Sequence, residues 1–239
     1  MSMKKTLFML GLMLVSLTAC KLSQFNPFRQ VIEHPQPEFI QANTFFTDLG
    51  CTESPECLPE SFLNNTLPID TLSEPPALFG GLSPYYPMAV AGTMVFGPRE
   101  EFAAVFSEGC MATQYVRYVV NVDGELKLIN SSSALADLYA PIESEGEALS
   151  YALAVTGLSA LYDLDQDSKI KHLVKPLEET YARFDGERFT VHLFDTYICG
   201  CGPHIIYSVE VIVEQDGTFK LGEPVEAFSD PALDGMCID

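Results

Sequence analysis

The sequence predicts a single-domain α+β fold, with an antiparallel β-sheet meander of hairpins covered on one face by short helices. Three observations support this prediction. Segments that alternate between apolar and polar residues recur along the chain, as half-buried strands do. Asp-Gly pairs, which favour hairpin turns, begin at Asp123, Asp185 and Asp216. Two segments with helix-capping signals lie together in mid-chain, and strands in runs beside helices in runs are typical of α+β domains.

The chain before residue 99 shows little regular periodicity. Residues 20–50 mix Gln, Asn and proline and predict a tether, although Phe39, Phe45 and Phe46 could dock on the domain. Residues 51–98 contain eight prolines and predict a loop-rich segment that lies over the core. We therefore expect the α+β domain to comprise residues 51–239.

The next segments carry clear local signals. Residues 98–109 predict a short helix, because proline opens the segment, two acids follow, and glycine closes it. Residues 113–122 alternate as a strand, and 125–129 predict its antiparallel partner. Asp123-Gly124 between them predicts a type I′ turn, so these residues should form a hairpin.

Two short helices should follow this hairpin. The three serines from Ser131 to Ser133 predict the N-terminus of a helix over 134–140, which a proline then ends. Ser144 and Glu147 have the spacing of a capping box. They predict a second helix through residue 156, with an apolar face toward the core and a glycine at its C-terminus.

The last third of the chain predicts a strand meander. Strands are expected over 177–184, 187–195, 205–214 and 219–221, and Asp-Gly turns separate two of these pairs. A Cys-Gly-rich corner at 199–204 interrupts the meander. Its glycines suit a sharp change in chain direction, so the corner should join two long strands.

The N-terminus predicts export. Lys4 and Lys5 precede an apolar run of thirteen residues, from Leu7 to Ala19, which is the pattern of a signal peptide. A membrane-spanning helix needs about 20 residues, so this run should not be a transmembrane anchor. Leu17-Thr-Ala-Cys20 resembles the lipobox of bacterial lipoproteins. An ordinary secretory signal beside an incidental cysteine is the alternative.

The lipobox resemblance covers only the first twenty residues, but it implies a cellular location. In that class residues 1–19 are removed as the signal peptide, the sulfur of Cys20 carries a diacylglycerol, and its amine is acylated. Several acyl chains hold a protein stably at a bilayer, so the membrane is an expected partner. Residue 21 is Lys and not Asp, which by resemblance to Gram-negative sorting rules implies the outer membrane when the cell has two.

The charge of the chain excludes one class of partner. The formal net charge is −20, and removal of residues 1–19 leaves 11 basic and 33 acidic residues, a net charge of −22. A surface of this sign repels nucleic-acid phosphates, so we expect no nucleic-acid binding. An unknown envelope protein or ligand is the expected partner beyond the membrane.

The cysteines predict disulfide bonds. Seven cysteines less the lipidated Cys20 leave an even number, and in an exported chain this predicts three bridges of open connectivity. Two neighbours in sequence should form a local pair, and the remaining four should link distant segments to the corner. The two corner cysteines would lie about 6.6 Å apart in an extended strand, so they are poor partners for each other. The six candidates are Cys51 and Cys57 (the local pair), Cys110 and Cys237, and the corner residues Cys199 and Cys201.

Two patterns suggest cation sites, each with a simpler alternative. Cys199, Cys201 and His204 carry donors for Cu(I) or Zn(II), or for redox chemistry, but we favour a disulfide corner because exported thiols oxidise. Acids also recur as in the opening of a calcium loop, but the glycine and the final glutamate of that loop are replaced by Ser and Val. We favour an acidic surface turn over a weak cation site there. The three acids are Asp163, Asp165 and Asp167.

No common catalytic motif occurs in the sequence. It contains no nucleophile elbow, no zinc-protease motif and no phosphate loop. His34, His172 and His192 belong to no motif, and His192 should lie on the solvent face of its strand. We therefore expect a non-enzymatic, lipid-anchored envelope protein without a cofactor and with a binding or structural role. A metal or redox protein, and a hydrolase with a dispersed catalytic set, are the alternatives.

Overall fold

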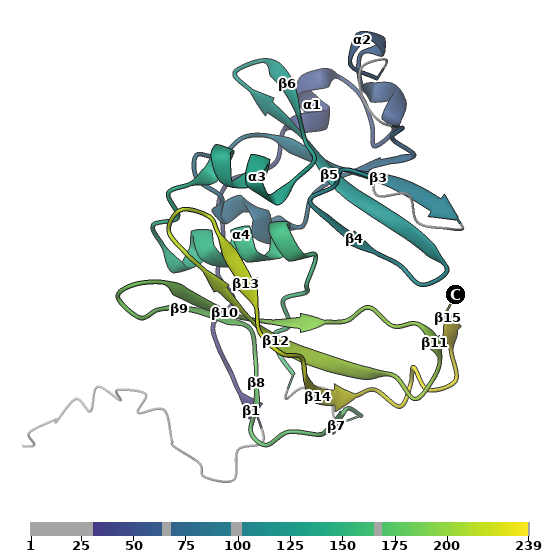
Figure 1. The fold of residues 1–239 in the computed structure, drawn as a ribbon, viewed down its shortest axis with the longest axis vertical. Helices are drawn as coiled ribbons and strands as arrows, with labels where there is room; N and C mark the ends of the chain where they lie inside the picture. Colours follow the sequence, from purple (N-terminus) through teal and green to yellow (C-terminus); the bar gives the residue numbers. More distant parts are fainter. Residues whose placement is uncertain (1–30, 64–67, 97–101, 165–168, 239) are drawn as a thin grey trace, which may run out of the picture.

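A computed structural model describes residues 31–238 except 64–67, 97–101 and 165–168, and it confirms the single-domain α+β fold with antiparallel sheets (Figure 1). The strands form two larger sheets rather than one. Helix α4 (Glu145–Thr156) lies between them and shares one hydrophobic core with both (Figure 1). No helix within the described ranges is long and apolar enough to cross a membrane.

The N-terminal sheet has five strands in the order β2-β3-β5-β4, with β6 also paired to β5. The predicted hairpin is confirmed as β5 and β6. Asp123 and Gly124 both have positive φ, at 52° and 91°, as a type I′ turn requires. The strands are β2 (Thr71–Ser73), β3 (Met88–Phe96), β4 (Phe106–Glu108), β5 (Ala112–Val122) and β6 (Glu125–Ile129).

Strand β3 corrects the prediction that residues 51–98 are loop-rich throughout. It is the second longest strand of this sheet and pairs with β5 along its whole length. Its small apolar residues contribute to core clusters on both faces, with Met88 on one and Ala89 and Ala91 on the other. A strand covered on both faces does not alternate between apolar and polar residues, so the period-two signal is absent.

Strand β4 corrects the predicted helix over 98–109, of which residues 98–101 lie outside the described part. Phe106 pairs with Val116 of β5, and its ring covers Gly157 at the C-terminus of α4. A Cβ on Gly157 would lie only 2.3 Å from that ring. Pairing with β5 and packing on α4 outweigh the local helix signals, because intrinsic propensity is a weak preference.

The C-terminal sheet has six strands in the order β7-β14-β12-β10-β9, with β13 also paired to β12. The meander from 187 to 221 is confirmed, but the strand predicted over 177–184 is two strands. The short β8 pairs in parallel with β1, whereas β9 pairs with β10, and the buried polar residues Glu179 and Thr180 separate them. The strands are β7 (Lys171–His172), β8 (Leu177–Glu178), β9 (Tyr181–Phe184), β10 (Phe189–Asp195), β12 (Ile205–Val213), β13 (Phe219–Leu221) and β14 (Val225–Ser229).

Both predicted mid-chain helices are confirmed. Helix α3 (Ser132–Tyr139) begins after Ser131, whose hydroxyl accepts a hydrogen bond from Ala134 N. Helix α4 begins with the predicted capping box of Ser144 and Glu147 and ends at a left-handed Gly157. Every residue from Ala148 to Val155 is buried. Over these residues helix α4 therefore has no solvent face, because one sheet packs on each side of it.

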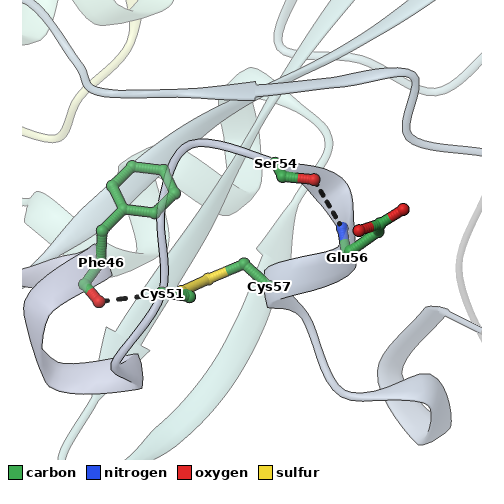
Figure 2. The surroundings of a disulfide bond; sticks show 5 residues. All are labelled: Phe46, Cys51, Ser54, Glu56 and Cys57. Atoms are coloured by element: carbon green, nitrogen blue, oxygen red, sulfur yellow. Dashed lines mark hydrogen bonds between the residues drawn. A yellow bond between two sulfur atoms is a disulfide. The ribbon is translucent and has the colours of Figure 1, made fainter.

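The predicted tether is shorter than residues 20–50. Residues 20–30 lie outside the described part, but β1 (Val31–Ile32) pairs with β8, and Phe45 and Phe46 of α1 are buried against β3. The Cys51–Cys57 pair follows α1 directly (Figure 2). The domain therefore includes residues 31–50, because their aromatic side chains cover apolar surface. Further short elements are α1 (Phe45–Leu49), η1 (Pro55–Cys57), α2 (Glu60–Leu63), η2 (Ala77–Gly81), β11 (Gly200–Cys201) and β15 (Cys237–Ile238).

Candidate functional site

The six cysteines after Cys20 form three pairs at disulfide distance, which confirms the predicted disulfide bonds. The Cα atoms are 5.6 Å apart in Cys51–Cys57, 5.6 Å in Cys110–Cys199 and 4.1 Å in Cys201–Cys237. The two corner cysteines take different partners, as expected. Cys110–Cys199 joins the turn after β4 to the loop after β10, so it links the two larger sheets.

The structure does not assemble the alternative metal site at the corner. The sulfurs of Cys199 and Cys201 belong to different disulfides. His204 is buried, and its Nε2 lies 3.1 Å from the carbonyl oxygen of Met236. Within the described ranges no three His, Cys, Asp or Glu residues are grouped so that they could hold a metal. Of the three acids of the calcium-like segment, Asp163 is exposed, and Asp165 and Asp167 lie outside the described residues.

A cavity of about 350 Å³ lies between the N-terminal sheet, the C-terminus of α4 and the segment that follows it. This is within the usual size of small-molecule sites. Most of its lining is apolar, and several of these side chains are only half-buried. The polar residues in the lining include Glu108, Gln114 and Ser159, and the apolar ones include Leu78, Val90, Phe106, Leu153, Leu158 and Ala160.

The elements around the cavity are held in place by specific contacts. Glu108 on β4 is paired with Gln114 on β5, so both side chains are set by the sheet register. Ser159 forms a bridge with Phe194 on β10, and its hydroxyl lies 2.7 Å from that of Thr196. The segment along one side of the cavity is therefore bound to β10 of the C-terminal sheet, and the Cys110–Cys199 disulfide is near Glu108 in the chain.

One carboxylate, that of Glu108, lines the cavity, and its charge is influenced by a second carboxylate outside the lining. Burial raises the pKa of Glu108, and the negative charge of Asp195 at the end of β10 raises it further. In the described part of the chain, neither carboxylate is ion-paired with a lysine or arginine. Asp195 accepts a hydrogen bond from Tyr197 N at 3.0 Å. The site thus offers an apolar space with excess negative charge on one side.

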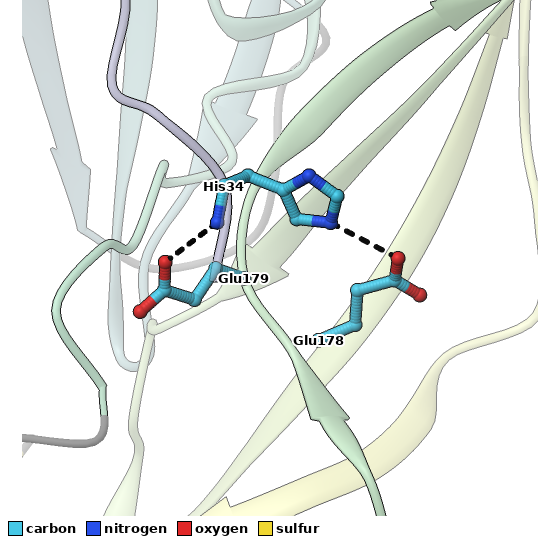
Figure 3. A network of polar contacts seen from close by, with 3 residues as sticks. All are labelled: His34, Glu178 and Glu179. Atoms are coloured by element: carbon cyan, nitrogen blue, oxygen red, sulfur yellow. Dashed lines mark hydrogen bonds and ion pairs between the residues drawn. The ribbon is translucent and has the colours of Figure 1, made fainter. Parts of the chain in front are cut away.

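A second polar cluster surrounds His34 (Figure 3). The carboxylate of Glu179, which is only 1% exposed, accepts hydrogen bonds from His34 N at 3.0 Å and from Leu164 N at 2.8 Å. His34 Nε2 lies 3.1 Å from an oxygen of Glu178 (Figure 3). These contacts bind the N-terminal segment to β8. The groups satisfy one another, so we assign this cluster a structural role.

A cavity of about 340 Å³ adjoins His34 and is also lined by Glu145, Tyr162 and Tyr181. Burial, with the charge of Glu179, raises the pKa of Tyr162 to about 12. Glu145 accepts a hydrogen bond from Phe184 N at 3.0 Å. The charged groups here are engaged by the protein itself, so the cavity beside Glu108 is the better candidate for ligand binding.

His192 corrects the expectation of a solvent-facing side chain. It is half-buried on the face of the C-terminal sheet away from α4, where β1 and β8 cover the neighbouring strands. Its ring is stacked on Tyr181 at 5.4 Å and meets Phe194 edge-on at 5.3 Å. Its Nε2 is enclosed without a hydrogen-bond partner. Burial lowers the pKa of His192, and the charges of Glu178 and Glu210 only partly oppose this effect.

We expect His192 to make the folded state less stable in acid. The unfolded chain binds a proton near pH 6.5, whereas the folded protein binds it at lower pH. Stability should therefore fall as pH decreases below about 6.5, by at most about 1.4 kcal/mol per pH unit. Urea unfolding at pH 7.5 and 5.5 should show a smaller loss for His192→Phe than for the wild type. Equal losses in the wild type and in His192→Phe would show that His192 does not cause the loss of stability in acid.

Sequence reasoning missed the cavity. Its lining comes from separate segments near residues 76–79, 90, 106–118 and 153–160, and only the fold brings these together. The sequence predicts a helix at Glu108, and no local pattern distinguishes this residue from other surface acids. No family model, curated protein or solved structure matches the chain. The fold and site therefore define the class of protein by geometry alone, as a disulfide-linked two-sheet α+β domain with an acidic, mainly apolar cavity.

Proposed function

We propose that this protein is a lipid-anchored protein of the bacterial cell envelope whose domain binds a small ligand without catalysing a reaction. The number and the pairing of the cysteines carry the proposal. The six cysteines after Cys20 form three pairs at disulfide distance, which leaves Cys20 as the odd one. Disulfides persist in oxidising compartments outside the cytosol. A lipid on Cys20, which the lipobox resemblance implies, accounts for the remaining thiol.

The position of the first described strand supports a domain held close to the bilayer. Val31 is buried and paired with β8. The ten residues between Cys20 and Val31 could span at most about 36 Å even if fully extended. The ligand would thus be taken up near a membrane surface, and the residue Lys21 favours the outer membrane in a cell that has two.

The lining of the Glu108 cavity favours binding over catalysis. A catalytic set needs a nucleophile or a general base with a partner that orients it. The lining residues supply one carboxylate and no histidine, cysteine or lysine, and the hydroxyl of Ser159 lies 2.7 Å from that of Thr196 and not beside a base. An apolar cavity with few polar groups is instead typical of a binding site.

Metabolic labelling with a fatty acid tests the anchor. The wild type should take up label and sediment with membranes, whereas Cys20→Ser should do neither. Cys51→Ser is the matched control, because it removes a different cysteine and should keep the label. Thiol titration of the unfolded, unreduced mature protein should find no free thiol. A wild type without label would contradict the anchor, and several free thiols would contradict the oxidising compartment.

A further inference from the structure

We propose that the Glu108 cavity binds a small hydrophobic organic cation, with an alkyl or aryl body inside and an ammonium group against Glu108, on the side nearest Asp195. The inference rests on the proposed binding role and adds the chemical class of the ligand. The apolar lining, the negative charge at one side and the disulfide beside that charge support it.

The apolar lining selects the body of the ligand. Leu78, Val90, Phe106 and Leu158 pack against the main core, yet each remains only partly buried beside the cavity. A hydrophobic group placed there would remove this surface from water, which is favourable in proportion to the area covered. An aliphatic or aromatic body fits this lining better than a sugar or a nucleotide would.

The charge at the cavity selects the head of the ligand. Glu108 is half-buried in the lining, and Asp195 directly follows Phe194, which forms a bridge with Ser159 of the same lining. Two carboxylates near each other in a partly buried site repel, and a cation beside Glu108 relieves that repulsion. No described lysine or arginine forms an ion pair with either of them. The net charge of −20 would also attract cations toward the protein and repel anionic amphiphiles.

The disulfide between the sheets supports the pairing of the two acids. Glu108 lies two residues before Cys110, and Asp195 lies four residues before Cys199. The Cys110–Cys199 bond therefore connects the segments that carry the two carboxylates. The Cα atoms of the two cysteines are 5.6 Å apart. This cross-link fixes the acidic side of the cavity even though the acids belong to different sheets.

Calorimetric titration of the full mature protein tests the inference with three probes of one chain length. Octylammonium carries the positive head, octanol the neutral head and octanoate the negative head. We expect octylammonium to bind about tenfold or more tightly than octanol, as a charge-assisted contact permits, and octanoate to bind most weakly. Glu108→Gln should lower the affinity for octylammonium by about tenfold and leave the affinity for octanol unchanged. Glu223→Gln, which neutralises an exposed acid away from the cavity, should change neither.

Each other outcome counts against the inference. Equal affinities for octylammonium and octanol, or an unchanged affinity in Glu108→Gln, would overturn the cationic head. Ala160→Phe fills the cavity, so unaltered octylammonium binding in that folded variant would overturn the location. If no probe binds, the ligand class is wrong. Acyl labelling of Cys20 tests the lipid anchor independently of these measurements. If only octanol binds, the proposed binding role stands, but the proposal that the ligand is a cation is overturned.

Discussion

Replacing both Cys110 and Cys199 with serine is expected to lower the free energy of unfolding by about 4–5 kcal/mol. This bond closes the longest loop of the three, with a sequence separation of 89 against 36 for Cys201–Cys237 and 6 for Cys51–Cys57. A cross-link restricts the unfolded chain more when the loop is longer. It also joins the two larger sheets, so its loss frees them from their only described covalent link outside the main chain.

Urea unfolding under non-reducing conditions measures this effect. Replacing Cys201 and Cys237 should cost about 3.8 kcal/mol, and replacing Cys51 and Cys57 about 2 kcal/mol, if loop length governs the loss. The last pair is the matched control, because it removes a bond within one short segment. An equal loss from all three double variants would contradict the loop-length explanation. The Cys110 and Cys199 variant should also bind octylammonium more weakly, since the two carboxylates would no longer be held together.

The parts of the fold that the sequence predicts well have short-range causes. Asp123-Gly124 specifies its hairpin because both residues tolerate positive φ, and the structure has both there. Ser144 and Glu147 specify the start of α4 because their side chains satisfy backbone groups within one turn. The local disulfide follows from the few residues between Cys51 and Cys57. In each case the residues that decide the structure are neighbours in the chain.

The parts that the sequence does not predict depend on contacts between distant residues. The sequence of strand β3 does not alternate between apolar and polar residues, because core clusters form on both of its faces. One of these clusters contains Phe45 and Phe46, which belong to the predicted tether. The β4 segment became a strand because β5 pairs with it. The sequence predicts that His192 faces solvent, because nothing near it in the chain shows that β1 and β8 cover that face of the sheet.

The candidate site has the same origin. Glu108 and Asp195 are 87 positions apart in sequence, and the apolar lining of the cavity comes from several separate segments. Sequence reasoning identified the cysteines that bring these segments together, but it left open which sulfurs pair. The sequence does not show that Cys110 pairs with Cys199, and this bond connects the two segments that carry the acids.

Replacing Tyr151 with alanine is expected to destabilise the protein by about 3–5 kcal/mol, as truncating a large buried aromatic side chain does. Tyr151 is fully buried in α4, and its hydroxyl donates a hydrogen bond to Gly217 O at 2.7 Å, in the hairpin between β12 and β13. Burial, with the charge of Asp216, raises the pKa of Tyr151 to about 12, so the hydroxyl keeps its proton at neutral pH. The residue therefore combines packing between the sheets with a bond from the helix to one of them.

Urea unfolding of Tyr151→Phe separates these two contributions. The phenyl ring keeps the packing and loses only the hydrogen bond, which should cost about 1–2 kcal/mol because Gly217 O then loses a partner. Tyr197→Phe is the matched control, since Tyr197 is 48% exposed and the same atom is removed there. That variant should change stability by less than about 0.5 kcal/mol. If Tyr151→Phe were as damaging as Tyr151→Ala, the hydrogen bond and not the packing would hold α4 to the C-terminal sheet, contrary to what its burial on all sides implies.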